Sequence, residues 1–125
     1  MQGKNIVIID DCRLTLAVAR DMLEAEGFGV ATAESTLAAN PLIFCKNPPD
    51  LIMVDVEMPL LNGGKTVELL KSRDNSKEIA VLMTSAKSSE ELSAIAEKAG
   101  ADGFVCKPLL PHILLPQVRA LIAAE

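Results

Sequence analysis

The chain has 125 residues, a length typical of one globular domain, and half of them are hydrophobic. Its 12 basic residues against 17 acidic ones give a net charge of −5 without any basic stripe, so direct binding of nucleic acid is not expected. No hydrophobic run approaches the roughly 18–20 residues of a membrane-spanning helix, and the N-terminus lacks the pattern of a signal peptide. We therefore expect a cytoplasmic protein without membrane attachment.

Five short hydrophobic runs predict strands. They are residues 6–9, 30–32, 51–54, 79–83 and 103–106. The first, third and fourth runs are apolar without alternation, which is typical of strands covered on both faces.

Longer segments between these runs carry apolar residues at helical spacing. The sets are Leu14, Val18 and Met22 with Leu23; Val67 and Leu70; Leu92, Ile95, Ala96 and Ala99; and Leu114, Val118, Leu121 and Ile122. Two expected helices contain an internal proline: residues 36–46 with Pro41, and residues 111–124 with Pro116. An internal proline removes a backbone donor, so we expect a kink or a late start in both. Pro111 instead suits a first helical turn.

The elements alternate as strand and helix, five times over. Such an order predicts an α/β fold in which helices cover both faces of a parallel sheet. Because crossover connections are right-handed, few topologies remain. One common choice is the flavodoxin-like, doubly wound sheet with strand order 2-1-3-4-5, whose ligands bind beyond the carboxyl ends of the strands near the switch between strands 1 and 3. We expect residues 1–125 to form one such domain, with five strands and five helices.

The three cysteines, Cys12, Cys45 and Cys106, are far apart and form neither a C-x-x-C pair nor a zinc spacing. We expect reduced thiols that are buried or half-buried. His112 is the only histidine, so zinc is not indicated, and we expect this side chain at the surface near a helix start.

Polar side chains follow four of the predicted strands, at the point where each strand ends. They are Asp10 and Asp11, then Asp55, then Thr84, and finally Lys107. Parallel strands bring these groups to one edge of the sheet, where converging carboxylates repel one another unless a cation neutralises them. Mg²⁺ prefers oxygen ligands together with water, so we predict Mg²⁺ as the cofactor.

An aspartate beside a bound cation can accept a phosphoryl group covalently. Such a transfer needs positioned groups that neutralise the equatorial oxygens of the phosphoryl group. The metal can contact one oxygen, the Lys107 ammonium a second and the Thr84 hydroxyl a third. Each polar strand end thereby has a role in phosphoryl transfer.

Four motifs resemble those of bacterial response regulator receiver domains. They are the acidic pair Asp10-Asp11, the signature D-x-x-M-P-x-x-x-G at residues 55–63, the element T-[S/A]-x at residues 84–86, and the block G-A-x-x-[F/Y]-x-x-K-P at residues 100–108. All four occur in the family's order, each at the end of a predicted strand, so the resemblance spans the chain from residue 4 to about 124. It implies a chemotaxis-response-regulator-like protein of two-component phosphorelay signalling.

The resemblance also implies roles for the site residues. Asp55 is the phosphoacceptor, and Thr84 and Lys107 assist the transfer. The implied metal ligands are Asp11 directly, Asp10 mostly through water, Asp55, and Glu57 through its backbone carbonyl. We also expect a cis peptide at Lys107-Pro108, which is a minority state for proline in general.

The implied switch starts with Thr84, which moves toward the phosphoryl group, and Phe104 then turns inward into the space that Thr84 leaves. This repacks the face of the fourth helix, fifth strand and fifth helix, where partners usually dock. The partners implied are a sensor histidine kinase or phosphotransfer protein and a downstream effector protein. We expect a monomer or weak dimer that is not an enzyme, apart from assisting its own phosphorylation and dephosphorylation. We favour a single-domain regulator over a receiver excised from a larger protein.

Glu57, two positions after the acceptor, departs from the pattern. Its negative side chain would either repel an incoming nucleophile or orient a water, and the sequence does not fix which. Two other functions compete with the phosphorylation switch. One is a degenerate receiver that binds partners without phosphorylation, although no acid, lysine or acceptor is missing. The other is a magnesium-dependent phosphatase of the haloacid dehalogenase type, for which the chain has no room for a cap domain.

Overall fold

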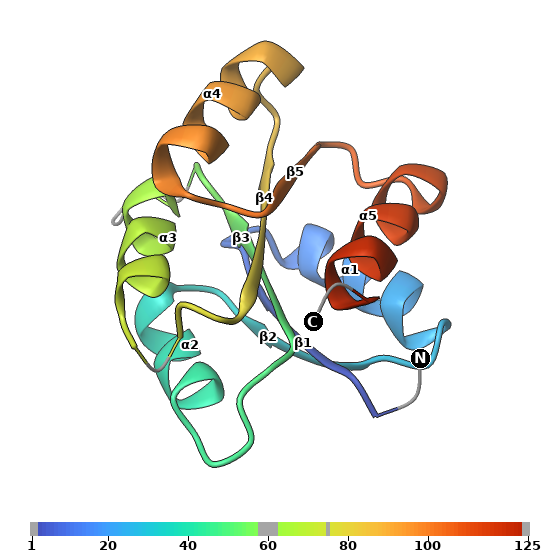
Figure 1. Ribbon diagram of the computed structural model, residues 1–125. Coiled ribbons are helices and arrows are strands. Elements are labelled where there is room, and N and C mark those ends of the chain that lie inside the picture. Colours follow the sequence, from blue (N-terminus) through green and yellow to red (C-terminus); the bar gives the residue numbers. More distant parts are fainter. Residues whose placement is uncertain (1–2, 58–62, 75, 124–125) are drawn as a thin grey trace.

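A computed structural model describes residues 3–57, 63–74 and 76–123 (Figure 1). Its strands are β1 (Asn5–Ile9), β2 (Gly29–Ala33), β3 (Leu51–Asp55), β4 (Ala80–Ser85) and β5 (Gly103–Cys106). Its helices are α1 (Arg13–Glu24), α2 (Thr36–Ile43), α3 (Gly63–Ser72), α4 (Ser89–Ala99) and α5 (Pro111–Ala123). The strands pair in parallel in the order β2-β1-β3-β4-β5, which confirms the predicted doubly wound fold.

The sheet is the middle of three layers. Successive residues of a strand point to opposite faces, so the apolar strands present a core to the helices on each side. On one face α1 and α5 cover a core that includes Ile8 and Leu82. On the other face α2, α3 and α4 cover a core that includes Ile9 and Met83. Figure 1 shows the same division of the helices. β3 and β4 are buried along their whole length, as their unbroken apolar runs predict.

The apolar face predicted for α1 is wrong in part. Leu14 is 73% exposed and Val18 is 39% exposed, whereas the buried residues of this helix are Leu16, Ala19 and Leu23. Both sets have helical spacing, so periodicity alone does not choose between them. The packed stripe places the small Ala19, fully buried, against the sheet, and it leaves an apolar stripe in solvent.

The late helix starts allowed for by the internal prolines do not occur. α2 runs from Thr36 through Pro41, and α5 starts at Pro111 and runs through Pro116. Pro116 is the sixth residue of α5, so the carbonyl that lacks its usual donor is that of His112, in the exposed first turn. Water can satisfy such a carbonyl, and the helix therefore tolerates the proline.

The expectation of buried or half-buried thiols is wrong for two of the three cysteines. Cys12 and Cys45 are exposed, Cys106 is half-buried, and all three are free. Cys12 is the N-cap residue of α1 and Cys45 lies in the loop after α2, where side chains face solvent. His112 is exposed near the start of α5, as predicted.

Candidate functional site

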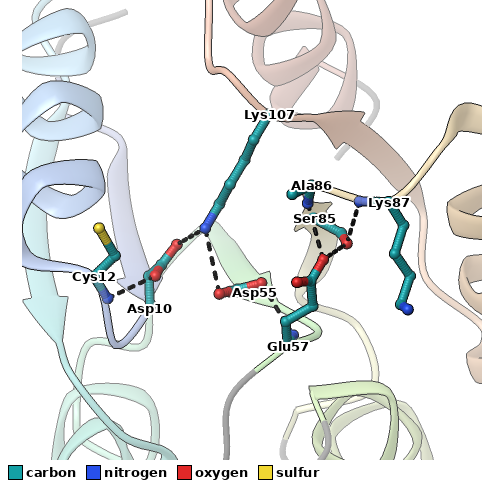
Figure 2. Close-up of polar contacts among 8 residues, drawn as sticks. All are labelled: Asp10, Cys12, Asp55, Glu57, Ser85, Ala86, Lys87 and Lys107. Carbon is teal, nitrogen blue, oxygen red and sulfur yellow. Dashed lines mark hydrogen bonds and ion pairs between the residues drawn. The ribbon is translucent and has the colours of Figure 1, made fainter.

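The carboxyl ends of the strands converge on one edge of the sheet, and their polar side chains form the candidate site (Figure 2). Asp10 follows β1 directly, Asp55 is the last residue of β3, and Lys107 follows β5. β1 and β3 are neighbours although β2 lies between them in the chain, so the site is at the topological switch point. Thr84 of β4 is the register partner of Asp55. The sheet therefore brings the predicted strand-end residues together.

Three carboxylates form the acidic part of the site. One carboxylate oxygen each from Asp10, Asp11 and Asp55 lies within 4.8 Å of the others. Asp10 and Asp55 are only 1% and 3% exposed, whereas Asp11 is exposed. The backbone N–H of Cys12 donates to Oδ1 of Asp10 at 2.9 Å, and that of Glu57 donates to Oδ1 of Asp55 at 3.0 Å. These local bonds fix both buried carboxylates at the ends of their strands.

Lys107 is the cation of the site. Its Nζ lies 2.9 Å from Oδ2 of Asp10 and 3.3 Å from Oδ2 of Asp55, so one ammonium bridges two buried carboxylates (Figure 2). Burial by itself would lower the pKa of Lys107, but the nearby carboxylate of Asp10, together with that of Asp55, raises it overall. Burial raises the pKa of Asp55, and the hydrogen bond from Glu57 N–H only partly opposes this effect. Lys107 is therefore a cation next to Asp55, whose ionised form is destabilised by burial.

The donor set suits magnesium. Oδ2 of Asp10 is buried and accepts no well-directed hydrogen bond from the part of the chain that the structure describes, although the Lys107 ammonium is near it. A buried carboxylate oxygen in this state favours a further positive partner. Three carboxylates, two of them buried and one open to solvent, match the oxygen ligands and retained waters that Mg²⁺ requires. The residues present therefore fit the predicted ion.

The two predicted switch residues lie on adjacent strands. Thr84 is buried at 3% exposure, and its backbone carbonyl accepts a hydrogen bond of 3.0 Å from Val56 N–H, which continues the ladder just past Asp55. Phe104 is half-buried against the core that α2, α3 and α4 cover. Its carbonyl accepts a hydrogen bond of 3.0 Å from the side chain of Gln117 on α5. The expected cis peptide at Lys107-Pro108 is present.

The side chain of Glu57 extends to the loop after β4 (Figure 2). Its Oε1 accepts hydrogen bonds from the hydroxyl of Ser85 and, at 3.0 Å, from Ala86 N–H. The bond from Ser85 is the main reason why the pKa of Glu57 is lowered, so this side chain is an anion at neutral pH. Sequence reasoning used Ser85 only as part of a motif. Ser85 directly after Thr84 and Glu57 two places after Asp55 were visible in the sequence. No local pattern predicts a hydrogen bond between these two residues, because they are 28 positions apart.

The sequence-family model of the response regulator receiver domain matches residues 6–119 of this chain. The chain belongs to this family. As a receiver domain, it serves phosphorylation-dependent signalling in a two-component system, and such domains are signalling modules, not classical enzymes. The signature residues 58–62 lie outside the described part of the chain. No helix in the described part is long and apolar enough to cross a bilayer.

Relatives of this receiver domain agree with the assignment. It is 33% identical over 125 residues to the phosphate regulon transcriptional regulatory protein PhoB of Pseudomonas aeruginosa, covering 98% of this chain and 53% of PhoB. It is 35% identical over 121 residues to the transcriptional regulatory protein PrrA of Mycobacterium tuberculosis, covering 94% of this chain and 49% of PrrA. The chain thus spans about half the length of these relatives. The structure of the chemotaxis protein CheY4 of Vibrio cholerae superposes with a TM-score of 0.83 at 25% identity, covering 94% of this chain and 98% of that one.

Proposed function

We propose that this receiver domain accepts a phosphoryl group on Asp55 in a reaction that requires Mg²⁺. The observation that supports this assignment best is the position of the Asp55 carboxylate, which is buried at the switch point, 3.3 Å from the Lys107 ammonium and within reach of two more carboxylates. A buried nucleophile of this kind needs cations beside it to hold the incoming anion.

Each side chain of the site has a role in this proposal. A carboxylate oxygen of Asp55 attacks phosphorus, the bond from phosphorus to the donor group breaks, and the donor group leaves with the electron pair. Lys107 holds one phosphoryl oxygen, and the Thr84 hydroxyl donates to another. Asp10, Asp11, Asp55 and the carbonyl of Glu57 would hold Mg²⁺, which neutralises charge on the transferred group when bound. Water later cleaves the acyl phosphate, which ends the signal.

We propose a sensor histidine kinase or phosphotransfer protein as the phosphodonor. An apolar surface lies beside Lys107, and it includes the exposed side chains of Leu14 and Val18. A pocket of about 190 Å³ opens within it, lined by Leu14, Thr15, Val18, Lys107, Pro108 and Leu109. A donor docked on this surface would stand next to the acceptor site. A downstream effector partner, the cytoplasmic location and the absence of nucleic-acid binding stay predictions.

Incubation with Mg²⁺ and acetyl phosphate tests the acceptor. We expect the mass of one phosphoryl group on the intact protein, lost when a chelator removes the metal. Asp55→Asn, which keeps the shape of the side chain, should take up none. An equal mass gain in Asp55→Asn, or no gain in the unmodified chain, would remove Asp55 as the acceptor. The same experiment separates this proposal from a partner-binding module that works without phosphorylation, and continuing turnover of added phosphate esters would instead indicate the hydrolase.

A further inference from the structure

The loop after β4 is tied to the end of β3 by a single side chain. Oε1 of Glu57 accepts from both the Ser85 hydroxyl and the Ala86 N–H, and the Ser85 hydroxyl oxygen in turn accepts from Lys87 N–H at 3.0 Å (Figure 2). Three consecutive residues, 85–87, thus depend directly or through one hydroxyl on this carboxylate. Hydrogen bonds to an ionised acceptor are stronger than bonds between neutral groups, so this anchor favours one position of the loop.

The anchored loop directly follows Thr84, the residue proposed to donate to the phosphoryl group. Ser85 is fully buried and sits in the last position of β4, while Ala86 and Lys87 are exposed. In the switch that the family resemblance implies, Thr84 moves toward a phosphoryl group on Asp55, which is its register partner on β3. An anchor one residue further along the chain opposes that movement.

Phosphorylation places a new charge beside the anchor. The backbone N–H of Glu57 is bonded to the Asp55 carboxylate at 3.0 Å, so acceptor and anchor are two residues apart and directly connected. A phosphoryl group adds about −1.5 to −2 charges. It therefore repels the Glu57 carboxylate, while it attracts the hydroxyl and N–H groups that the carboxylate now holds.

We propose that Glu57 and Ser85 act as positioning residues that hold residues 85–87 in the unphosphorylated position, and that phosphorylation of Asp55 must break their hydrogen bond. This inference rests on the proposed function. Glu57 thereby makes the phosphorylated conformation harder to reach, and Ser85 is the group through which it acts.

A double-mutant cycle with a phosphoryl mimic tests this inference. The dissociation constant of beryllofluoride is measured at saturating Mg²⁺ for the unmodified chain, Glu57→Ala, Ser85→Ala and the double variant. We expect each single variant to bind about five- to tenfold more tightly, since each removes the same charge-assisted bond. The double variant should gain no more than either single one, because the two residues form one interaction.

Two further variants separate the anchor from simple charge repulsion. Glu57→Gln loses the charge but keeps an acceptor oxygen for Ser85, so it should retain part of the anchor and bind the mimic less tightly than Glu57→Ala. Glu97→Gln on α4 removes an exposed negative charge away from the loop and should bind like the unmodified chain. Hydrogen exchange at the Ala86 amide, measured without the mimic, should quicken in Glu57→Ala but not in Glu97→Gln.

Three outcomes would overturn the inference. If the mimic binds equally to all variants, the anchor does not oppose phosphorylation, although the proposed function stands. If Glu57→Ala and Glu57→Gln gain equally while Ser85→Ala is unchanged, the effect is repulsion without an anchor. If the unmodified chain binds no mimic with Mg²⁺ present, the proposed function fails, and this inference fails with it.

Discussion

At the scale of single residues, the site is defined by an imbalance of charge. Asp10, Asp11 and Asp55 bring three carboxylates together, and Lys107 supplies one ammonium that bridges two of them. Burial adds to the cost of charge at Asp55, which is why its pKa is raised. The same cost makes Asp55 receptive to groups that neutralise it, so its destabilising environment and its proposed reactivity have one physical cause.

Asp55→Asn should therefore stabilise the fold at neutral pH. The folded-state pKa of Asp55 lies above its ordinary value of 3.8, so the fold favours the neutral acid, and the penalty appears as pH rises through the raised pKa. We expect the variant to gain on the order of 1 kcal/mol in unfolding free energy at pH 7 without Mg²⁺. The gain should vanish below about pH 4. Urea unfolding at several pH values measures it.

The control for this prediction is Asp74→Asn, because Asp74 is 99% exposed and pairs only with Lys77 at 3.3 Å among the residues described. Its unfolding free energy should follow that of the unmodified chain at every pH. A gain for Asp55→Asn that persists undiminished at acid pH would show that the burial of charge is not its cause.

At the scale of elements, α1 and α5 determine what the surface beside the site looks like. α1 turns Leu16, Ala19 and Leu23 to the sheet and leaves Leu14 and Val18 in solvent. α5 is apolar along most of its length and still exposes Ile113 and Pro116. Exposed apolar side chains on the outer side of a helix are typical of a partner-binding surface. This surface lies beside Lys107, on the opposite side of the sheet from α4.

Pro116→Ala should stabilise α5. The alanine restores an N–H that can donate to the His112 carbonyl, and it relieves the crowding of the preceding turn. We expect a gain of about 1–2 kcal/mol in unfolding free energy by urea titration, since the site is exposed and near the helix start. Pro111→Ala is the matched control in the same helix, because a first-turn proline lacks no intrahelical bond, and it should change stability little. Destabilisation by Pro116→Ala would mean that the proline packs against a neighbour.

At the scale of the whole molecule, folding itself assembles the acidic cluster. Asp10 and Asp55 are 45 positions apart in the sequence, and only the pairing of β1 with β3 brings them together. The repulsion among their carboxylates therefore opposes folding of a chain whose net charge is already −5. A ligand that binds only the folded cluster adds its binding free energy to the stability of the entire domain.

Mg²⁺ should raise the unfolding free energy of the unmodified chain by about 2.7 kcal/mol at a concentration 100 times its dissociation constant. Thermal unfolding across a Mg²⁺ titration measures this effect. Asp11→Ala should lose most of this stabilisation, because Asp11 is the solvent-exposed carboxylate of the cluster and is expected to bind the ion directly. Asp74→Ala, a variant outside the cluster, should keep it. An equal response to Mg²⁺ in Asp11→Ala would remove Asp11 from the site.

The sequence by itself determined the order of the elements and placed the candidate site residues at the strand ends. Unbroken apolar runs marked β3 and β4 as buried strands, and Asp10, Asp55 and Lys107 could be placed at strand ends from those runs alone. This worked because parallel strands with right-handed crossovers leave few arrangements, and all of them gather the carboxyl ends at one edge.

Only the tertiary structure decided which stripe of α1 is buried and where the side chain of Glu57 goes. Leu14 and Leu16 have equally good helical spacing, and the choice between them depends on how α1 packs against the sheet, where Ala19 is fully buried. Glu57, two residues past the end of β3, meets Ser85 at the end of β4 because β3 and β4 pair in the sheet although α3 separates them in the chain. Periodicity describes a single element, whereas these two features depend on contacts between elements.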